Sequence, residues 1–374
     1  REVEPPYSHR PNGRFQYPVG PWHHRTPNVY WLPKAALHKH SRRRDKVPHF
    51  DMLICNGCVV DGTGAPPFSA DVAVLDGRIA AIGHQLGSAS QTIDATGLLV
   101  TPGFVDVHTH FDGQATWDQR LWPTSQQGVT TAVMGNCGVG FAPCRPEDRD
   151  TLIALMEGVE DIPDTALHEG LPWTWESFPE YLNALGALRY DIDIAALLPH
   201  GPLRVYAMGE RAVRREPASE QDLQTMQQLV RQGLAAGAVG LSTSRTMAHR
   251  SKSGDFTPMY QAVSHELLQL GLSLKNYPNS VFQMISDFDD TEKEFSILSR
   301  VSQATGRAST LTVIQYPHKP QLHRELLQLI TQANADGQRI TGQVLNRPVG
   351  VLMGFECSLN PFSCKPSYEA LAHL

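Results

Sequence analysis

Two histidines separated by one residue, His108 and His110, are the side chains of this sequence best suited to metal chemistry. They follow a short apolar run that begins after Pro102. Because Pro102 has no backbone N–H to offer a sheet, we expect the strand to start at Gly103. Side chains alternate along a strand, so both imidazoles should point the same way. The spacing therefore predicts a pair of metal ligands, and the alternative is a pair of ordinary surface or capped histidines.

A third candidate ligand, Cys137, lies in a Gly-Asn-Cys-Gly turn directly after the next expected strand. Free cysteines are commonly small buried hydrophobes, which is the alternative reading of this residue. The flanking glycines, Gly135 and Gly138, allow the backbone to approach closely, as a crowded site requires. Two imidazoles and one thiolate are donors that Zn²⁺ accepts, so we expect a Zn²⁺ site formed by His108, His110 and Cys137.

The elements that would position these ligands form a repeating strand–helix pattern. The run that leads to His108 has no polar alternation, which predicts a strand buried on both faces of a parallel sheet. A helix is expected at 220–236, with Ser219 as its N-cap and Gly237 as its end, and another at 319–335. Seven such units indicate a barrel rather than an open sheet. The further expected strands are 128–134, 193–198, 238–242, 281–285, 310–314 and 339–344.

The chain divides into three expected parts. Residues 1–49 are rich in Pro, Arg, Lys and His and should form a disordered basic segment. Residues 50–100 predict a small antiparallel β module of two hairpins, at 51–60 around Asn56-Gly57 and at 71–82 around Asp76-Gly77. Residues 101–374 predict an incomplete TIM barrel. The eighth strand is not found before Leu374, so we expect a C-terminally truncated barrel.

The bulk composition indicates a globular protein without a nucleic-acid or membrane partner. A net charge of −6 gives no basic field for nucleic acid, and no stretch reaches the roughly 18 apolar residues that cross a bilayer. Six cysteines are too few for a disulfide scaffold, which predicts reduced thiols and a cytoplasmic location. Cys55 and Cys58 flank a turn and are expected to be structural.

Four further residues at expected strand ends are candidates for substrate binding. His200 follows the third strand and is either a substrate contact or a satisfied core histidine. Arg245 and Arg250 could each clamp a carboxylate bidentately, whereas the loop that carries His249 and Arg250 could equally be solvated. Asp287 is a candidate replacement ligand, with a helix-capping role as the alternative.

The phrases at 101–110 and 135–138 resemble the amidohydrolase superfamily, and together they are similar to its D-aminoacylase (N-acyl-D-amino-acid deacylase) branch, also called amidohydrolase family 3. Residues 172–182 and 240–246 resemble further motifs of that branch. The resemblance extends from about Phe50 to Leu374. It implies a distorted (β/α)8 TIM barrel with a small β-sandwich built from both chain ends. Residues 50–100 would then be half of that sandwich.

The resemblance implies Zn²⁺-dependent hydrolysis of linear amide C–N bonds, with N-acyl-D-amino acids as small-molecule substrates and Cys137 as a metal ligand. The superfamily's histidine ligands after strands five and six are replaced here by Ser286-Asp287 and Gln315-Tyr316. Its general-base aspartate is expected beyond Leu374. One alternative is a cyclic-amide hydrolase of the hydantoinase or dihydroorotase type, although those favour a carboxylated lysine over a cysteine. The other is a truncated, non-catalytic scaffold protein.

Overall fold

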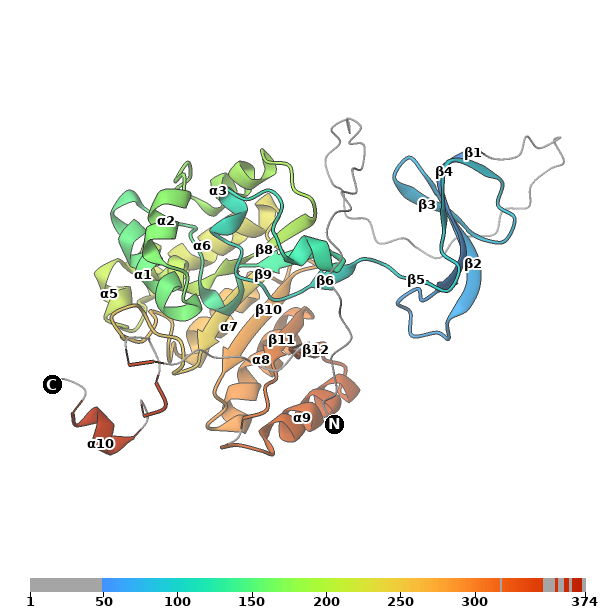
Figure 1. The fold of residues 1–374 in the computed structure, drawn as a ribbon. Helices are drawn as coiled ribbons and strands as arrows, with labels where there is room; N and C mark the ends of the chain where they lie inside the picture. The colour runs from blue at the N-terminus through green and yellow to red at the C-terminus, as the bar shows by residue number, and fades with distance from the viewer. Residues whose placement is uncertain (1–48, 317, 346–353, 356–359, 363–364, 372–374) are drawn as a thin grey trace, which may run out of the picture. The chain divides into compact units, whose positions relative to one another are not determined.

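The computed structural model describes residues 49–316, 318–345, 354–355, 360–362 and 365–371. The chain divides into two compact units after Val100, and each is described by itself (Figure 1). The basic segment expected at residues 1–49 lies outside the described residues except for His49.

The first unit is a small sheet of mixed strand direction rather than the antiparallel module expected from sequence. β1 pairs antiparallel with β2, and β2 pairs antiparallel with β3, but β1 pairs parallel with both β4 and β5. The order is β3-β2-β1-β4, and β5 extends the pairing of β1. The strands are β1 (His49–Val59), β2 (Phe68–Leu75), β3 (Arg78–Gly83), β4 (Ser88–Asp94) and β5 (Leu99–Val100).

One of the two expected hairpins is confirmed and the other is wrong. Asp76 and Gly77 join β2 to β3 with φ values of +52° and +70°, as a two-residue hairpin turn requires. Asn56 and Gly57 instead form an irregularity inside the continuous strand β1, where its register on β2 shifts. A Cβ on Gly57 would lie 2.4 Å from the Val100 side chain, so this glycine allows β5 to approach β1.

The second unit contains the strand–helix repeat that the sequence predicts. Each strand pairs in parallel with its sequence neighbours, so the sheet order is β12-β11-β10-β9-β8-β7-β6 in the described residues. The sheet curls as a half-barrel (Figure 1), which confirms the expected α/β barrel class. The strands are β6 (Phe104–Asp106), β7 (Val129–Met134), β8 (Asp193–Pro199), β9 (Gly240–Arg245), β10 (Val281–Ser286), β11 (Ala308–Thr312) and β12 (Ile340–Gln343).

The helices of this unit begin and end at recognisable capping residues. Ser219 caps helix α6 by accepting from the Asp222 N–H, and Gly237 ends it with a φ of +116°, as predicted. Asp290 caps α8 by accepting from the Lys293 N–H. The helices are α1 (Arg149–Glu160), α2 (Asp164–Gly170), α3 (Phe178–Gly186), α4 (His200–Met208), α5 (Glu210–Val213), α6 (Glu220–Ala236), α7 (Ser264–Leu272), α8 (Thr291–Thr305), α9 (Leu322–Ala335) and α10 (Pro366–Glu369).

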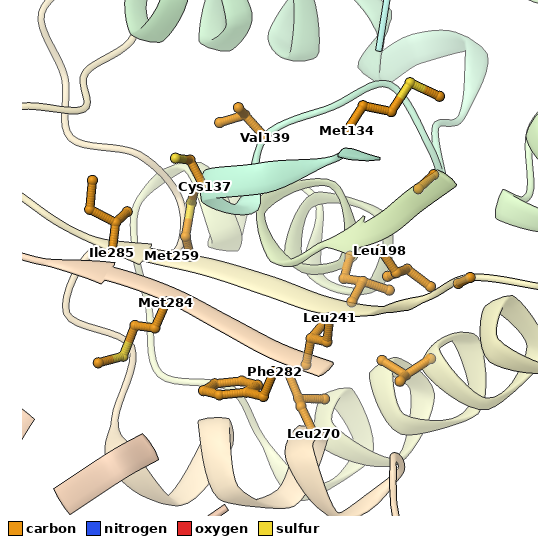
Figure 2. Close-up of a cluster of buried hydrophobic side chains, with 14 of the residues drawn as sticks. Met134, Cys137, Val139, Leu198, Leu241, Met259, Leu270, Phe282, Met284 and Ile285 are labelled. Carbon is orange, nitrogen blue, oxygen red and sulfur yellow. The ribbon is translucent and has the colours of Figure 1, made fainter. Parts of the chain in front are cut away.

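A continuous apolar core fixes the strand ends of the second unit. Leu198, Leu241 and Phe282, from three neighbouring strands, are fully buried in one cluster with Leu270 of α7 (Figure 2). Burying each such side chain stabilises the fold by roughly 1.5–3 kcal/mol. Cys137 belongs to the same cluster, so the loop that carries it rests on the core. The positions of the strand-end loops are therefore set by well-packed strands.

The strand before the two histidines is shorter and more exposed than expected. β6 holds only Phe104–Asp106, and the side chains of Phe104 and Val105 are 60% and 56% exposed. In the described residues β6 pairs with β7 alone, so it is an edge strand rather than one buried on both faces. No helix of the described residues has the length and apolar character needed to cross a membrane.

Candidate metal centre

The three side chains predicted as ligands meet at one point of the structure. Donor atoms of His108, His110 and Cys137 all lie within 4.8 Å of one another. His108 Nε2 is 3.1 Å from Cys137 Sγ. Zinc bonds of about 2.0–2.3 Å in a tetrahedral arrangement place neighbouring ligand atoms roughly 3.3–3.6 Å apart. The donor set therefore has the composition of a zinc site, and its atoms lie close enough together for small side-chain rotations to bring them onto one ion.

The two histidines lie just after β6, in a segment that stays alongside β7. Thr109, between them, donates both its backbone N–H and its hydroxyl to the carbonyl of Val133, at 3.0 and 2.9 Å. This double contact holds the residue between the histidines against β7. The centroids of the two imidazole rings lie 5.4 Å apart. The alternation expected of a strand thus continues beyond its formal end at Asp106.

The turn that carries Cys137 depends on its glycines. Gly135 has a φ of +77°, and a Cβ there would lie 2.1 Å from the backbone oxygen of Leu197. No other residue type fits that position without moving a strand. Cys137 itself has a φ of +56°, a conformation that costs a non-glycine residue about 1–3 kcal/mol and is concentrated at functional sites.

Hydrogen bonds from distant elements hold this strained turn. The Cys137 N–H donates to Gln283 Oε1 at 3.1 Å, and the Gly138 N–H donates to Ser242 Oγ at 3.0 Å. Asn136 is fully buried and donates to the carbonyls of Val133 and Thr109, at 2.9 and 3.4 Å. Asn136 therefore ties the cysteine turn to the histidine segment.

His108 is held in one tautomer by a residue from the other end of the sheet. Its Nδ1 lies 2.8 Å from Oε1 of Gln343, the last residue of β12. Because an amide oxygen only accepts, Nδ1 carries the proton and Nε2 presents a bare lone pair toward Cys137. Burial lowers the pKa of His108, so the ring stays neutral, as a metal ligand must be.

The electrostatics of the surrounding groups also fit a cation. Burial raises the pKa of the Cys137 thiol well above its ordinary value. Burial also raises the pKa of Asp112 to about 7 and that of Glu160 to about 8. Burial, then the charges of His108 and His249, depresses the pKa of His110. A divalent cation held by His108, His110 and Cys137 would reverse this balance, because it would favour the thiolate form of Cys137 and ionised carboxylates nearby.

Among the four candidate substrate contacts, His249 interacts electrostatically with the proposed ligands His108 and His110. Its Nδ1 lies 2.9 Å from Ser244 Oγ. Burial, together with the charge of His108, lowers the pKa of His249 to about 4. Its loop is fastened by Asp287, which accepts from the Thr246 hydroxyl and from the Met247 N–H. Asp287 thus positions this loop, whereas the sequence offered it as a replacement ligand or a helix cap.

The two candidate arginines have partners within the protein. Arg245 forms a two-point ion pair with Glu294, with N–O distances of 2.6 and 2.8 Å, and also donates to the Ala262 carbonyl. The Arg250 guanidinium lies 4.1 Å from the centre of the Phe256 ring and donates to the Gly254 carbonyl. Both guanidinium groups therefore have partners within the protein, Arg245 on helix α8 and Arg250 in the loop after β9.

His200 is fully buried, and both of its ring nitrogens are in use. Nε2 lies 2.8 Å from Glu266 Oε1, and Nδ1 lies 2.9 Å from Thr243 Oγ1. Arg204, 2% exposed, donates to both oxygens of the same carboxylate. This arrangement matches the satisfied core histidine that the sequence left open. The network is an internal ion pair rather than part of the metal centre.

This ion pair predicts a pH dependence of stability. His200 and Arg204 hold the pKa of Glu266 at about 2 against the effect of burial, below its ordinary value of 4.5. The carboxylate therefore stabilises the fold above pH 4.5, and the contribution is lost as the pH falls toward 2. We expect the stability difference between wild type and Glu266→Gln to shrink by about 1.4 kcal/mol per pH unit below 4.5. Urea unfolding at several pH values measures it, and a constant difference down to pH 3 would contradict it.

Several residues of the site have no motif in the sequence. Gln283, Gln343 and Glu160 lie on β10, on β12 and at the end of α1, far along the chain from the histidines. Glutamine and glutamate are common residue types, and the spacing of these three residues along the chain follows no motif. Of the supporting residues, Asn136 alone lies within a sequence motif, the Gly-Asn-Cys-Gly turn that contains Cys137.

Comparisons with known proteins agree with this architecture. The model of a family described as "Amidohydrolase family" matches residues 91–370. D-aminoacylase from Alcaligenes xylosoxydans xylosoxydans is 32% identical over 222 residues, which cover 59% of this chain and 41% of that protein. N-acyl-D-glutamate deacylase from the same organism is 37% identical over 196 residues, covering 52% of this chain and 37% of that protein. The matched part thus spans less than half of either relative.

Solved structures show the same relationship. A crystal structure of D-aminoacylase matches with a TM-score of 0.65 and 28% identity, over 80% of this chain and 59% of that chain. N-acyl-D-glutamate deacylase from Bordetella bronchiseptica, solved with zinc and a phosphonate inhibitor, matches with a TM-score of 0.64 and 30% identity, over 80% and 59% of the two chains. The chain therefore belongs to the amidohydrolase family, which is metal-dependent, and within it to the branch of D-aminoacylase.

Proposed function

We propose that this chain is a zinc-dependent hydrolase of linear amide C–N bonds that deacylates N-acyl-D-amino acids. The observation that carries the proposal is the convergence of His108, His110 and Cys137 within 4.8 Å, with the lone pair of His108 Nε2 facing the thiol. Relatives named as deacylases of N-acyl-D-amino acids support the substrate class. We propose zinc because the donors are nitrogen and sulfur, and because a related structure contains that metal.

The proposed roles of the residues follow from their surroundings. A bound zinc ion supplies Lewis acidity, which activates water near neutral pH and polarises an amide carbonyl. Gln343 fixes the tautomer of His108, and Asn136 keeps the cysteine turn next to the histidine segment. We propose that His249, which is held by Ser244, contacts the substrate beside the metal. Its neutral ring can donate or accept a hydrogen bond there.

The test combines metal content and turnover in one preparation of the purified chain. We expect at least one zinc per chain after dialysis, and release of the free amino acid from N-acetyl-D-amino acids. The matching L enantiomers and a hydantoin serve as controls for chirality and for cyclic-amide hydrolysis. Zinc binding with turnover of the hydantoin alone would favour the cyclic-amide alternative. A folded chain that binds zinc and hydrolyses none of these compounds would contradict the proposed reaction. A folded chain without zinc would favour the scaffold alternative.

A further inference from the structure

Glu160, the last residue of helix α1, reaches the metal centre from outside the barrel strands. Its Oε1 lies 3.2 Å from Nε2 of His110, and the two side chains are 23% and 14% exposed. Helix α1 lies in the segment between β7 and β8, after the turn that carries Cys137, and is part of neither ligand-bearing motif. The contact therefore joins a separate element to one of the three proposed ligands.

The two ring nitrogens of His110 differ in their surroundings. Nε2 faces the carboxylate of Glu160, whereas Nδ1 is buried and has no hydrogen-bond partner in the described residues. A buried, unpaired ring nitrogen is costly unless something binds it. His108 shows the complementary arrangement, because Gln343 holds its Nδ1 and its Nε2 faces Cys137. Each imidazole thus has one nitrogen held by the protein and one available to a cation.

The charge on Glu160 opposes the electrostatics of its own helix. The C-terminal end of a helix carries partial negative charge and favours basic residues there. The last turn of α1 contains no basic residue, and Glu160 is its final position. A cation held on the far side of His110 would offset this unfavourable placement.

We propose that Glu160 is a positioning residue of the metal centre, which accepts the Nε2 proton of His110 and leaves Nδ1 of that ring to bind the metal. This inference rests on the proposed zinc site and extends it by one residue. Carboxylates in this role orient the ring and raise its basicity, and their loss typically weakens metal binding by about 10–100-fold. Glu160 does not bind the metal itself.

The same helix offers a matched control. Glu157, one turn earlier, pairs with Lys252 at 2.9 Å and takes no part in the metal cluster. We expect Glu160→Ala to weaken zinc binding by about 10–100-fold in competition with a chromophoric chelator. Glu157→Ala should bind zinc as wild type does. Glu160→Gln, which keeps the shape and one acceptor oxygen, should fall between them and also covers the case in which the alanine variant fails to fold.

Cobalt distinguishes positioning from direct ligation. At saturating Co²⁺, the visible spectrum of Glu160→Gln should match that of wild type, because the ligands are unchanged. A changed spectrum at saturation would make Glu160 a ligand and overturn the proposal. Equal zinc affinity in wild type and both Glu160 variants would overturn it too, with the zinc site intact. If wild type and Glu157→Ala also bind neither ion, the proposed zinc site itself is wrong.

Discussion

Replacing Cys137 by alanine is expected to abolish stoichiometric zinc binding. The thiolate is the only sulfur donor in the cluster, and its loss leaves two imidazoles. The effect should exceed the roughly 10–100-fold cost of losing a group that merely orients a ligand. Zinc content after dialysis measures it. Thiolate-to-cobalt absorption in the near ultraviolet should disappear in the same variant.

Cys144 provides the matched control for this substitution. It is also buried and lies in the same apolar cluster, but its thiol donates to the Arg145 carbonyl and is not among the cluster's donors. Cys144→Ala creates a similar small cavity without removing a ligand, so its zinc content should equal that of wild type. Retention of wild-type zinc by Cys137→Ala, or equal loss in both variants, would remove Cys137 from the proposed site.

The barrel strands could be predicted because local and global preferences agree there. The runs that became β7, β8 and β10 consist mainly of apolar residues, many of them β-branched or aliphatic, and each is followed by a turn or by polar residues. Helix α6 has a capping box at its start and a glycine at its end, so both boundaries were visible. Each signal lies within a few residues of the element that it predicts.

The first unit shows where local signals become ambiguous. An Asn-Gly pair can adopt positive φ at both positions, as a hairpin turn needs, but in β1 only Asn56 does so, with a φ of +62°, and the pair forms a strand irregularity instead. Only the partners decide between them, and β1 is flanked by β2 and by the parallel strands β4 and β5. Pairing with β4 and β5 depends on residues much further along the chain. The sequence near Asn56 therefore does not indicate that β4 and β5 will pair with β1.

The site divides in the same way. The proposed ligands lie within two short phrases, so residue type and spacing revealed them. Their supports, Gln343 and Glu160, come from other elements and are recognisable only once the fold brings them near the histidines. His200 was ambiguous because a histidine after a barrel strand can face the centre or the helices. Its contact with Glu266 of α7 shows that the His200 side chain faces the helices.

Replacing Glu266 by alanine is expected to cause the largest loss of stability among single changes at this network. Arg204, 2% exposed, would lose the carboxylate that it contacts with both oxygens, and His200 Nε2 would lose its acceptor. Breaking a buried ion pair from one side costs about 3–5 kcal/mol, because an uncompensated charge stays buried. The free energy of urea unfolding measures the effect.

The physical cause can be separated from a general effect of removing a glutamate. Glu216 pairs with Arg211 and Arg214 at the surface, where its side chain is 41% exposed, so Glu216→Ala should cost far less stability than Glu266→Ala. The double variant Arg204→Met/Glu266→Leu removes both charges and should recover part of the stability lost in Glu266→Ala, since no uncompensated charge stays buried. Equal stabilities of Glu216→Ala and Glu266→Ala would contradict the buried-charge explanation. Because no residue of this network is among the donors of the metal cluster, folded Glu266→Ala should keep the zinc content of wild type.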